Sequence, residues 1–563
     1  MKIHLLFFAL FTFALAGRVR TDGLKVAEVF TDHLVLQRDM PVPIWGTANS
    51  GDTVTVEFAG QKKAAEVGDD GKWLVKLDPL KASAEPLKMT IRSQASSIES
   101  QDILVGEVWL GSGQSNMQFG LNNPGKNKDV KPSRQIRILV SAARTHTKFA
   151  GLKESGLSNW VVADKPENLK GFSELLFFFG QKLQQELNVP VGLVIGAVGG
   201  TPSGDWCPRA ALEKDREIRR QMELYAKIYP EFGKKNQEIA AAWEKLADKD
   251  QVGWGDPRRP NMKGIPKPAT SDKLAKAGHL FESHIRPLVG YGIRGVLWDQ
   301  GETGVDVPGV DQYTMMGVLI KAWRDAWGQG EFPWIYVQKH NGGGPALDYK
   351  DPITCMAEKF EPLPPDVPAD PCLGLHQEFH IMIMGHANTA MVSATDLGGG
   401  VHPKNKFGYG MRAARVALGF VYGKPVEIYG PIYTSHQISG NKITIKFSHA
   451  GQGLVTAQSD KLQGFMVAGK DRRFVWADAK ITGKDTVEVW SDKVAQPAAV
   501  RYAWARLHPW ANLFNKDGLP ALTFRTGTWK TDFWYPKREW DLYKKKMIHV
   551  FPWVYWVDKV ETP

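Results

Sequence analysis

The sequence predicts an α/β protein whose central domain has a mainly parallel sheet and lies between two β-rich regions. Apolar strands alternate with helical patterns between about residues 103 and 425, which is typical of a parallel sheet covered by helices. Short strand patterns separated by turn residues precede this stretch and return after it. At 563 residues the chain is too long for a single compact core, so we expect several domains.

The N-terminal residues 1–16 have the pattern of a secretory signal peptide. Lys2 precedes an apolar run over residues 5–16, and Ala14-Leu15-Ala16 forms a small-residue cleavage site, so we expect cleavage near Ala16/Gly17. This run is too short to span a membrane, and no later stretch is long and apolar enough to do so. The pattern predicts a secreted or periplasmic protein.

Residues 17–102 are expected to form an N-terminal β-sandwich-like domain. Residues 53–58 and 73–77 alternate between apolar and polar side chains, and Gly and Asp residues punctuate the sequence between them. Alternation with a period of two is the pattern of a strand with one buried face.

Residues 103–425 are expected to form the central α/β domain. The strands are predicted from apolar runs at 103–110, 191–195, 295–298, 334–337 and 390–394. Ser173 is a suitable N-cap for a helix whose apolar face runs to Leu187, and a second helix is expected over about 407–418. In parallel sheets of this kind the ligand site lies beyond the carboxyl ends of the strands.

Three further regions complete the predicted organisation. A charged helical insertion is expected at about 207–275, a C-terminal β-rich domain at 426–525, and an aromatic and basic tail at 526–563 to which the sequence assigns no role.

Composition excludes several classes of function. The net charge of +11 is spread along the chain, and the longest basic run is Lys544–Lys546, which does not favour nucleic-acid binding. No Cys and His spacing indicates a zinc site. Cys355 and Cys372 flank a Pro-rich loop and could pair in an oxidising compartment, which would leave Cys207 unpaired.

Four loops that follow predicted strands contain residues with catalytic chemistry. Ser115 lies in a Gly-flanked turn that could expose its hydroxyl, and Gly199–Thr201 allows close approach of backbone to a ligand. A Gln300 amide could donate to an oxyanion, and Glu302 could organise neighbouring hydrogen bonds. The Gly-rich loop Asp396–His402 could bring an imidazole to the serine. Each loop alone is weak evidence.

Together these loops resemble the sialate O-acetylesterase family, which belongs to the SGNH hydrolases. The matching segments, in order along the chain, are Val35–Arg38, Pro43–Gly46, Val105–Met117, Gly199–Thr201 leading to Trp206, Trp298–Thr303, Asp396–Gly398, His402–Lys406, Arg501–Trp504 and Asn512–Pro520. The resemblance therefore covers about residues 25 to 525.

This resemblance implies an SGNH-type three-layer α/β/α core and a serine esterase. Ser115 would be the nucleophile and His402 the general base, and the backbone N–H groups of Ser115 and Gly200 with the Gln300 side chain would form the oxyanion hole. Asn116, Gly199 and Glu302 would support the site. The implied reaction removes O-acetyl groups from sialic acid or a related glycan through an acetyl-enzyme, without metal or cofactor.

The chain also departs from the family pattern beside the implied pocket. Asp299 replaces the usual Tyr, Thr303-Gly304 replaces Ser-Asn, and the family's Asp shortly before the His is absent, since Gly400 precedes Val401. Asp396 is the candidate third member of a triad, although a backbone carbonyl could orient His402 and leave a dyad. Two alternatives stay open: an esterase for xylan-type polysaccharides, and a non-catalytic carbohydrate-binding protein on a decayed esterase fold.

Overall fold

The computed structural model describes residues 23–141, 156–223 and 276–526, apart from 306, 308, 309, 340 and 369–373. The expected signal peptide, most of the helical insertion and nearly all of the C-terminal tail lie outside the described residues. Cys372 also lies outside them, so its pairing with Cys355 stays a prediction.

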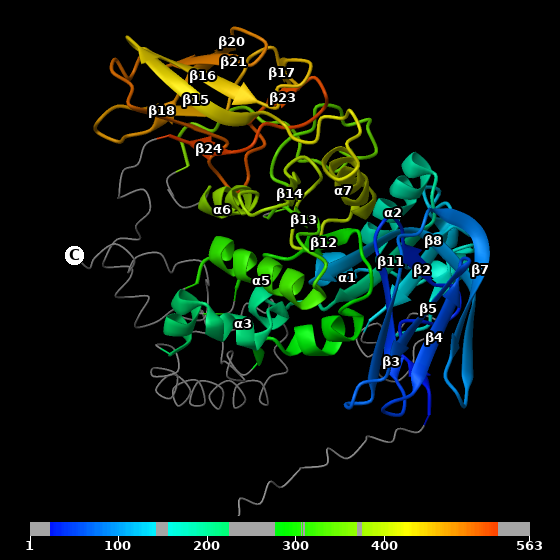
Figure 1. Cartoon of the computed structure of the whole chain (residues 1–563). Coiled ribbons are helices and arrows are strands. Elements are labelled where there is room, and N and C mark those ends of the chain that lie inside the picture. The colour runs from blue at the N-terminus through cyan, green and yellow to red at the C-terminus, as the bar shows by residue number, and fades with distance from the viewer. Residues whose placement is uncertain are drawn as a thin grey trace, which may run out of the picture.

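A central, mainly parallel sheet organises the molecule (Figure 1). Its neighbouring strands are parallel except β10, which pairs antiparallel with β9. In spatial order the strands are β10 (Val161–Val162), β9 (Ile136–Val140), β11 (Val191–Ala197), β8 (Ser97–Gly113), β12 (Gly295–Asp299), β13 (Trp334–Val337) and β14 (Thr389–Val392). The central strands are buried along their length, which explains their continuous apolar sequences.

Helices cover both faces of this sheet. On one face α2 (Glu174–Leu187) and α7 (Lys406–Phe420) bury a core that includes Phe179 and Ala413. On the other, α5 (Gln312–Trp327) and α6 (Leu375–Ile383) pack with α3 (Arg209–Lys214) nearby, as Figure 1 shows. Short helical turns occur at Pro124–Lys126, Pro166–Leu169, Ser203–Trp206, Phe281–Ile285 and Arg286–Leu288. The predicted three-layer α/β/α core is confirmed.

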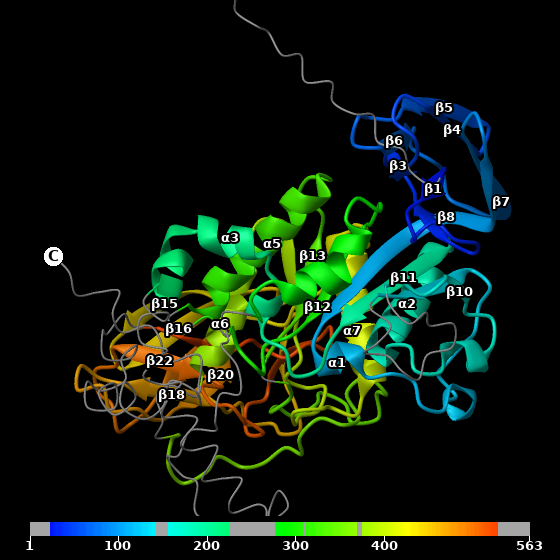
Figure 2. The same cartoon turned by 90° about the horizontal axis from the view of Figure 1, so that it is seen from below.

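The N-terminal β region is joined to the core by one long strand. Strand β8 pairs first with β2 (Val35–Gln37) and β7 (Ser83–Arg92), then continues into the core sheet (Figure 2). The predicted domain boundary at residue 102 therefore falls inside β8. The remaining N-terminal strands are β1 (Lys25–Val26), β3 (Val42–Thr47), β4 (Thr53–Phe58), β5 (Gln61–Glu66) and β6 (Lys72–Leu77).

The C-terminal region consists of small antiparallel sheets beside α6 and α7 (Figure 1). One sheet contains β15 (Ile432–Ser439), β16 (Lys442–Ser448), β21 (Thr486–Trp490) and β20 (Asp478–Ile481). A second contains β19 (Val475–Trp476), β18 (Phe465–Ala468), β22 (Ala499–Tyr502) and β24 (Phe524–Arg525), and β17 (Leu454–Thr456) pairs with β23 (Leu513–Asn515). The predicted flanking β-rich regions are thus present on both sides of the core.

Local sequence signals fix the helix ends. The Ser173 hydroxyl accepts a hydrogen bond from the Leu176 N–H at 3.1 Å, which caps α2 as predicted. The same helix ends at Asn188, whose left-handed φ of 51° allows the chain to turn before Pro190. None of the helices within the described ranges combines the length and apolarity needed to cross a membrane.

Candidate active site

The predicted functional loops meet at the carboxyl edge of the central sheet. Strand β8 ends at Gly113, and helix α1 (Ser115–Gln118) begins immediately afterwards with the candidate nucleophile. Gly113 has a φ of +126°, and a Cβ on it would collide with the backbone of Asp299. Only glycine therefore lets the chain turn here between two parallel strands.

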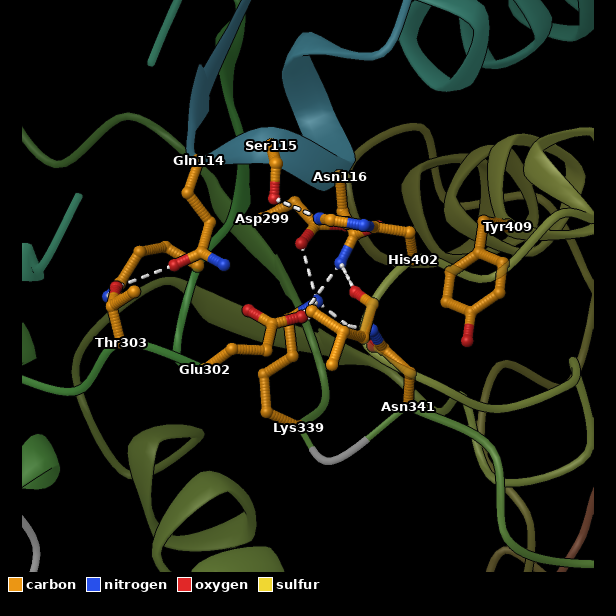
Figure 3. Close-up of polar contacts among 12 residues, drawn as sticks. Gln114, Ser115, Asn116, Asp299, Glu302, Thr303, Lys339, Asn341, His402 and Tyr409 are labelled. Atoms are coloured by element: carbon orange, nitrogen blue, oxygen red, sulfur yellow. Dashed lines mark hydrogen bonds and ion pairs between the residues drawn. The ribbon is translucent and has the colours of Figure 1, made fainter. Parts of the chain in front are cut away.

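Ser115 and His402 lie within hydrogen-bonding distance. His402 Nε2 is 3.0 Å from Ser115 Oγ, and the two side chains face one another in Figure 3. His402 comes from the loop between β14 and α7, and the Phe119 ring packs edge-on against the imidazole with 4.7 Å between ring centroids. This is the arrangement in which an imidazole can take a hydroxyl proton.

The structure does not bring Asp396 to His402, contrary to our expectation. Both Asp396 oxygens accept hydrogen bonds from the Arg412 guanidinium, at 3.1 and 2.8 Å, and both side chains are buried. No hydrogen bond joins Asp396 to His402 within the described ranges. The bidentate guanidinium holds the carboxylate, so Asp396 ties α7 to the sheet edge.

Asn116 connects the serine loop to the histidine loop. Its Nδ2 donates to Glu302 Oε1 at 2.7 Å and to the Val401 carbonyl at 3.0 Å. Its Oδ1 accepts from Lys406 Nζ at 2.6 Å. Because Val401 precedes His402, the Asn116 amide holds the base beside the nucleophile.

A buried cluster of charged side chains lies next to Asn116 and contacts its hydrogen-bond partner Glu302 (Figure 3). Lys339 Nζ lies 2.5 Å from Asp299 Oδ1, 2.8 Å from Glu302 Oε1 and 2.9 Å from Asn341 Oδ1. Asn341 Nδ2 also donates to Glu302 Oε1 at 3.0 Å. The side chains of Lys339 and Asp299 are fully buried, so each charge is stabilised by its oppositely charged neighbours and not by water.

Burial and mutual attraction set the protonation of this cluster. Burial raises the pKa of Asp299 although Lys339 opposes it, whereas burial of Glu302 is outweighed by Lys339, which leaves the Glu302 pKa below its usual value. Burial works against the Lys339 charge, but Asp299 and Glu302 more than compensate and its pKa is raised. Burial lowers the pKa of Lys406 to about 8, although Asp299 partly opposes this.

The Gly199-Gly200 turn lies against the nucleophile. A Cβ on Gly199 would lie 3.3 Å from Ser115 Cβ, and the Gly199 N–H donates to Gln118 Oε1 at 2.7 Å. Gly200 has a φ of +73°, and a Cβ there would face open space. Ser115 is the first residue of α1, so its own N–H has no carbonyl partner inside that helix.

Gln300 is buried within its own loop. Its Nε2 donates to the Gly304 carbonyl at 2.8 Å and lies 3.3 Å from Thr303 Oγ1. Thr303 Oγ1 donates to Gln114 Oε1 at 2.7 Å, which ties the Gln300 loop to the residue before Ser115 (Figure 3). The predicted role of Gln300 as an oxyanion donor would require it to release Gly304.

Sequence reasoning missed the basic and amide partners of the cluster. Lys339 follows the predicted strand 334–337, so its place at a strand end was a signal that it could reach the site. Lys406 lies in the histidine motif itself. Gln114 lies in the nucleophile segment directly before Ser115, and Asn341 follows Lys339 in the same loop.

The described side chains include no group of three or more His, Cys, Asp or Glu that could hold a metal ion.

Comparisons with known proteins identify relatives over most of the chain. No protein-family model matches the sequence. The rat sialate O-acetylesterase is 26% identical to this chain over 533 residues, an alignment that covers 86% of this chain and 90% of that protein. The human sialate O-acetylesterase is 25% identical over 541 residues, covering 87% of this chain and 89% of that protein. A carbohydrate acetylesterase from Xanthomonas citri has the same fold, with a TM-score of 0.65, 26% identity, and coverage of 90% of this chain and 100% of that structure. The chain is therefore a homologue of the sialate O-acetylesterases and an ester hydrolase of the carbohydrate acetylesterase type.

Proposed function

We propose that this esterase removes acetyl groups from sugar hydroxyls with Ser115 as nucleophile and His402 as general base. The observation that carries the proposal is the 3.0 Å separation of His402 Nε2 and Ser115 Oγ at the carboxyl edge of the sheet. An imidazole at this distance can remove the hydroxyl proton as the oxygen attacks.

The reaction proceeds in two acyl-transfer steps. Ser115 Oγ bonds to the acetyl carbonyl carbon while its proton moves to His402 Nε2, and the carbonyl π electrons move onto oxygen. When the carbonyl re-forms, the bond to the sugar oxygen breaks and that oxygen takes the proton from His402. Water then attacks the acetyl-enzyme, with His402 again accepting a proton and returning it to Ser115 Oγ, and acetate leaves.

The backbone N–H groups of Ser115 and Gly200 are the proposed oxyanion donors. Ser115 begins a helix, and a Cβ on Gly200 would meet no atom within 4 Å, so a bound carbonyl group has room to approach the backbone there. Gln300 remains a candidate third donor, although its amide is occupied by Gly304. Gly199, with its N–H held by Gln118, keeps the turn close to the nucleophile.

We assign the orientation of His402 to its surroundings and not to an acidic triad member. Asn116 holds the preceding carbonyl of Val401, and the Phe119 ring packs against the imidazole edge. The Asp396 carboxylate is paired with the Arg412 guanidinium, which favours a Ser-His dyad over a triad. This arrangement keeps the two reacting side chains aligned without a buried negative charge next to the base.

The relatives' names support O-acetylated sialic acid or a related glycan as the substrate class. Acetylated plant or algal polysaccharide is the second candidate, favoured by the groove described in the next subsection. The pattern of residues 1–16 supports export of the protein to the periplasm or the exterior.

Release of acetate tests the proposal. Wild type, Ser115→Ala and His402→Ala would be assayed with O-acetylated sialic acid, acetylated xylan and a simple aryl acetate. The proposal expects release by wild type and a loss of about 10³-fold or more in both variants. Absence of release from every donor would favour the alternative of a non-catalytic carbohydrate-binding protein.

A further inference from the structure

Exposed apolar side chains gather on the loops around Ser115 and His402. Four of the nine large hydrophobic side chains that are exposed within the described ranges lie there, namely Phe119, Met356, Val401 and Leu507, with exposed fractions between 43% and 59%. Phe119 packs against His402, and Val401 is its neighbour in sequence. Clustered exposed apolar surface marks a binding site more often than scattered single residues do.

Close backbone contacts join these loops into one surface. A Cβ on Gly398 would lie 3.2 Å from Met356 Cβ, and a Cβ on Gly343 would lie 3.5 Å from Leu507 Cα. Gly342 and Gly399 are also packed backbone to backbone. These contacts join the loops that carry Met356 and Leu507 to the histidine loop.

A groove continues this surface away from the dyad. It has a volume of about 470 Å³. Its walls are formed by Glu358, Glu361, Pro362, Pro364, Leu507 and Trp510. The Glu361 N–H donates to the Pro509 carbonyl at 3.2 Å, which ties the two walls together. Glu358 Oε1 lies 2.9 Å from the position of a Cβ on Gly399, so the groove reaches the loop that carries His402.

The chemistry of the lining selects a ligand. Glu358 and Glu361 carry only acceptor oxygens, which suit sugar hydroxyls, while the proline and leucine side chains suit the apolar faces of sugar rings. Trp510 is only 4% exposed and forms the floor beneath them. The lining contains no lysine or arginine. An anionic glycan in this groove would lie against the like charges of two carboxylates, whereas a neutral glycan would not be repelled by them.

We propose that this groove is a subsite that binds the neutral sugar chain next to the acetylated residue. The proposal rests on the acetylesterase function proposed above, and of the two substrate classes named there it selects an O-acetylated neutral oligo- or polysaccharide over O-acetylated sialic acid. The acetyl ester lies at the dyad, and the chain continues past Leu507 toward Glu361.

Binding to an inactive protein tests the subsite independently of catalysis. Affinity for an acetylated neutral xylo-oligosaccharide would be measured by calorimetry on Ser115→Ala, and on Ser115→Ala carrying Leu507→Asp or Glu361→Ala. Both positions are exposed, so the variants should fold. We expect Kd to rise by about tenfold in each, the effect of losing one good contact. The control Leu74→Asp replaces an exposed leucine of the N-terminal region and should leave Kd within about twofold.

Catalysis supplies the second measurement. In the active enzyme, Leu507→Asp and Glu361→Ala should lower the ratio of kcat/KM for the acetylated oligosaccharide to that for an aryl acetate by about tenfold. An unchanged Kd and an unchanged ratio would refute the subsite while leaving the esterase intact. No detectable binding of the oligosaccharide by Ser115→Ala, or tighter binding of an O-acetylated sialoside, would also refute it. Binding that depends on Leu507 and Glu361 without any acetate release would refute the proposed esterase and not the subsite.

Discussion

Replacement of Lys339 by methionine should destabilise the protein severely. The Lys339 ammonium is fully buried and contacts Asp299 at 2.5 Å and Glu302 at 2.8 Å. Methionine has a similar length but no charge, so Lys339→Met removes the ammonium that directly contacts the two buried carboxylates. Removing one partner of a buried ion pair costs about 3–5 kcal/mol, which is a large share of a typical unfolding free energy of about 5–15 kcal/mol.

Urea unfolding followed by tryptophan fluorescence measures this loss. The control is Lys321→Met, because Lys321 forms an ion pair of 2.6 Å with Asp325 on the exposed side of α5, where the two side chains are 73% and 62% exposed. That pair should contribute only about 0.3–0.5 kcal/mol.

The charge argument also predicts a partial rescue. Adding Asp299→Asn to Lys339→Met removes one of the two uncompensated charges and should recover part of the lost stability. A loss below about 1 kcal/mol in Lys339→Met, or a further loss in the double variant, would refute the reasoning that the cluster is held by its charges.

Three further predictions concern the base, the cluster and the nucleophile turn. Asp396→Asn should lower the unfolding free energy by about 3 kcal/mol, because the ion pair with Arg412 is lost. The folded variant should nevertheless keep kcat/KM within about tenfold of wild type, whereas replacing a carboxylate that orients the catalytic histidine would lower activity about 10⁴-fold. Because burial lowers the Lys406 pKa to about 8, the folded protein releases this proton at lower pH than the unfolded chain does. The unfolding free energy of wild type, relative to that of Lys406→Met, should therefore rise between about pH 8 and about pH 10.4. A difference between the two proteins that stays constant over this pH range would contradict the prediction. Gly199→Ala places a methyl group 3.3 Å from Ser115 Cβ and should lower kcat by roughly 10–100-fold with little change in the urea midpoint, whereas Gly125→Ala, with its nearest contact at 3.6 Å, should change neither.

The order of strands and loops made much of the site predictable. Ser115 and His402 follow strands with apolar sequences, and parallel strands deliver such loops to one edge of a sheet. Their meeting at 3.0 Å follows from this topology together with the glycines that permit the tight turns. Helices with a periodic apolar pattern, such as α2, were also predictable, because the spacing of their apolar residues shows which face is buried.

The partners of charged side chains were not predictable in the same way. Asp396 lies six residues before His402, yet its carboxylate points to Arg412 on α7, and sequence separation says nothing about that direction. The positions of Lys339 and Lys406 placed them near the site, but their burial could not be read from the sequence. Only the folded arrangement shows which ammonium groups are buried against Asp299 and Asn116.

Labelling with a serine-directed organophosphonate tests the central claim most directly, since it requires no knowledge of the natural glycan. Mass spectrometry of the digested protein should find the label on Ser115, with no labelling in Ser115→Ala and a greatly slowed rate in His402→Ala. Labelling of another residue, or an unchanged rate in His402→Ala, would contradict the assignment of Ser115 as nucleophile and His402 as its base.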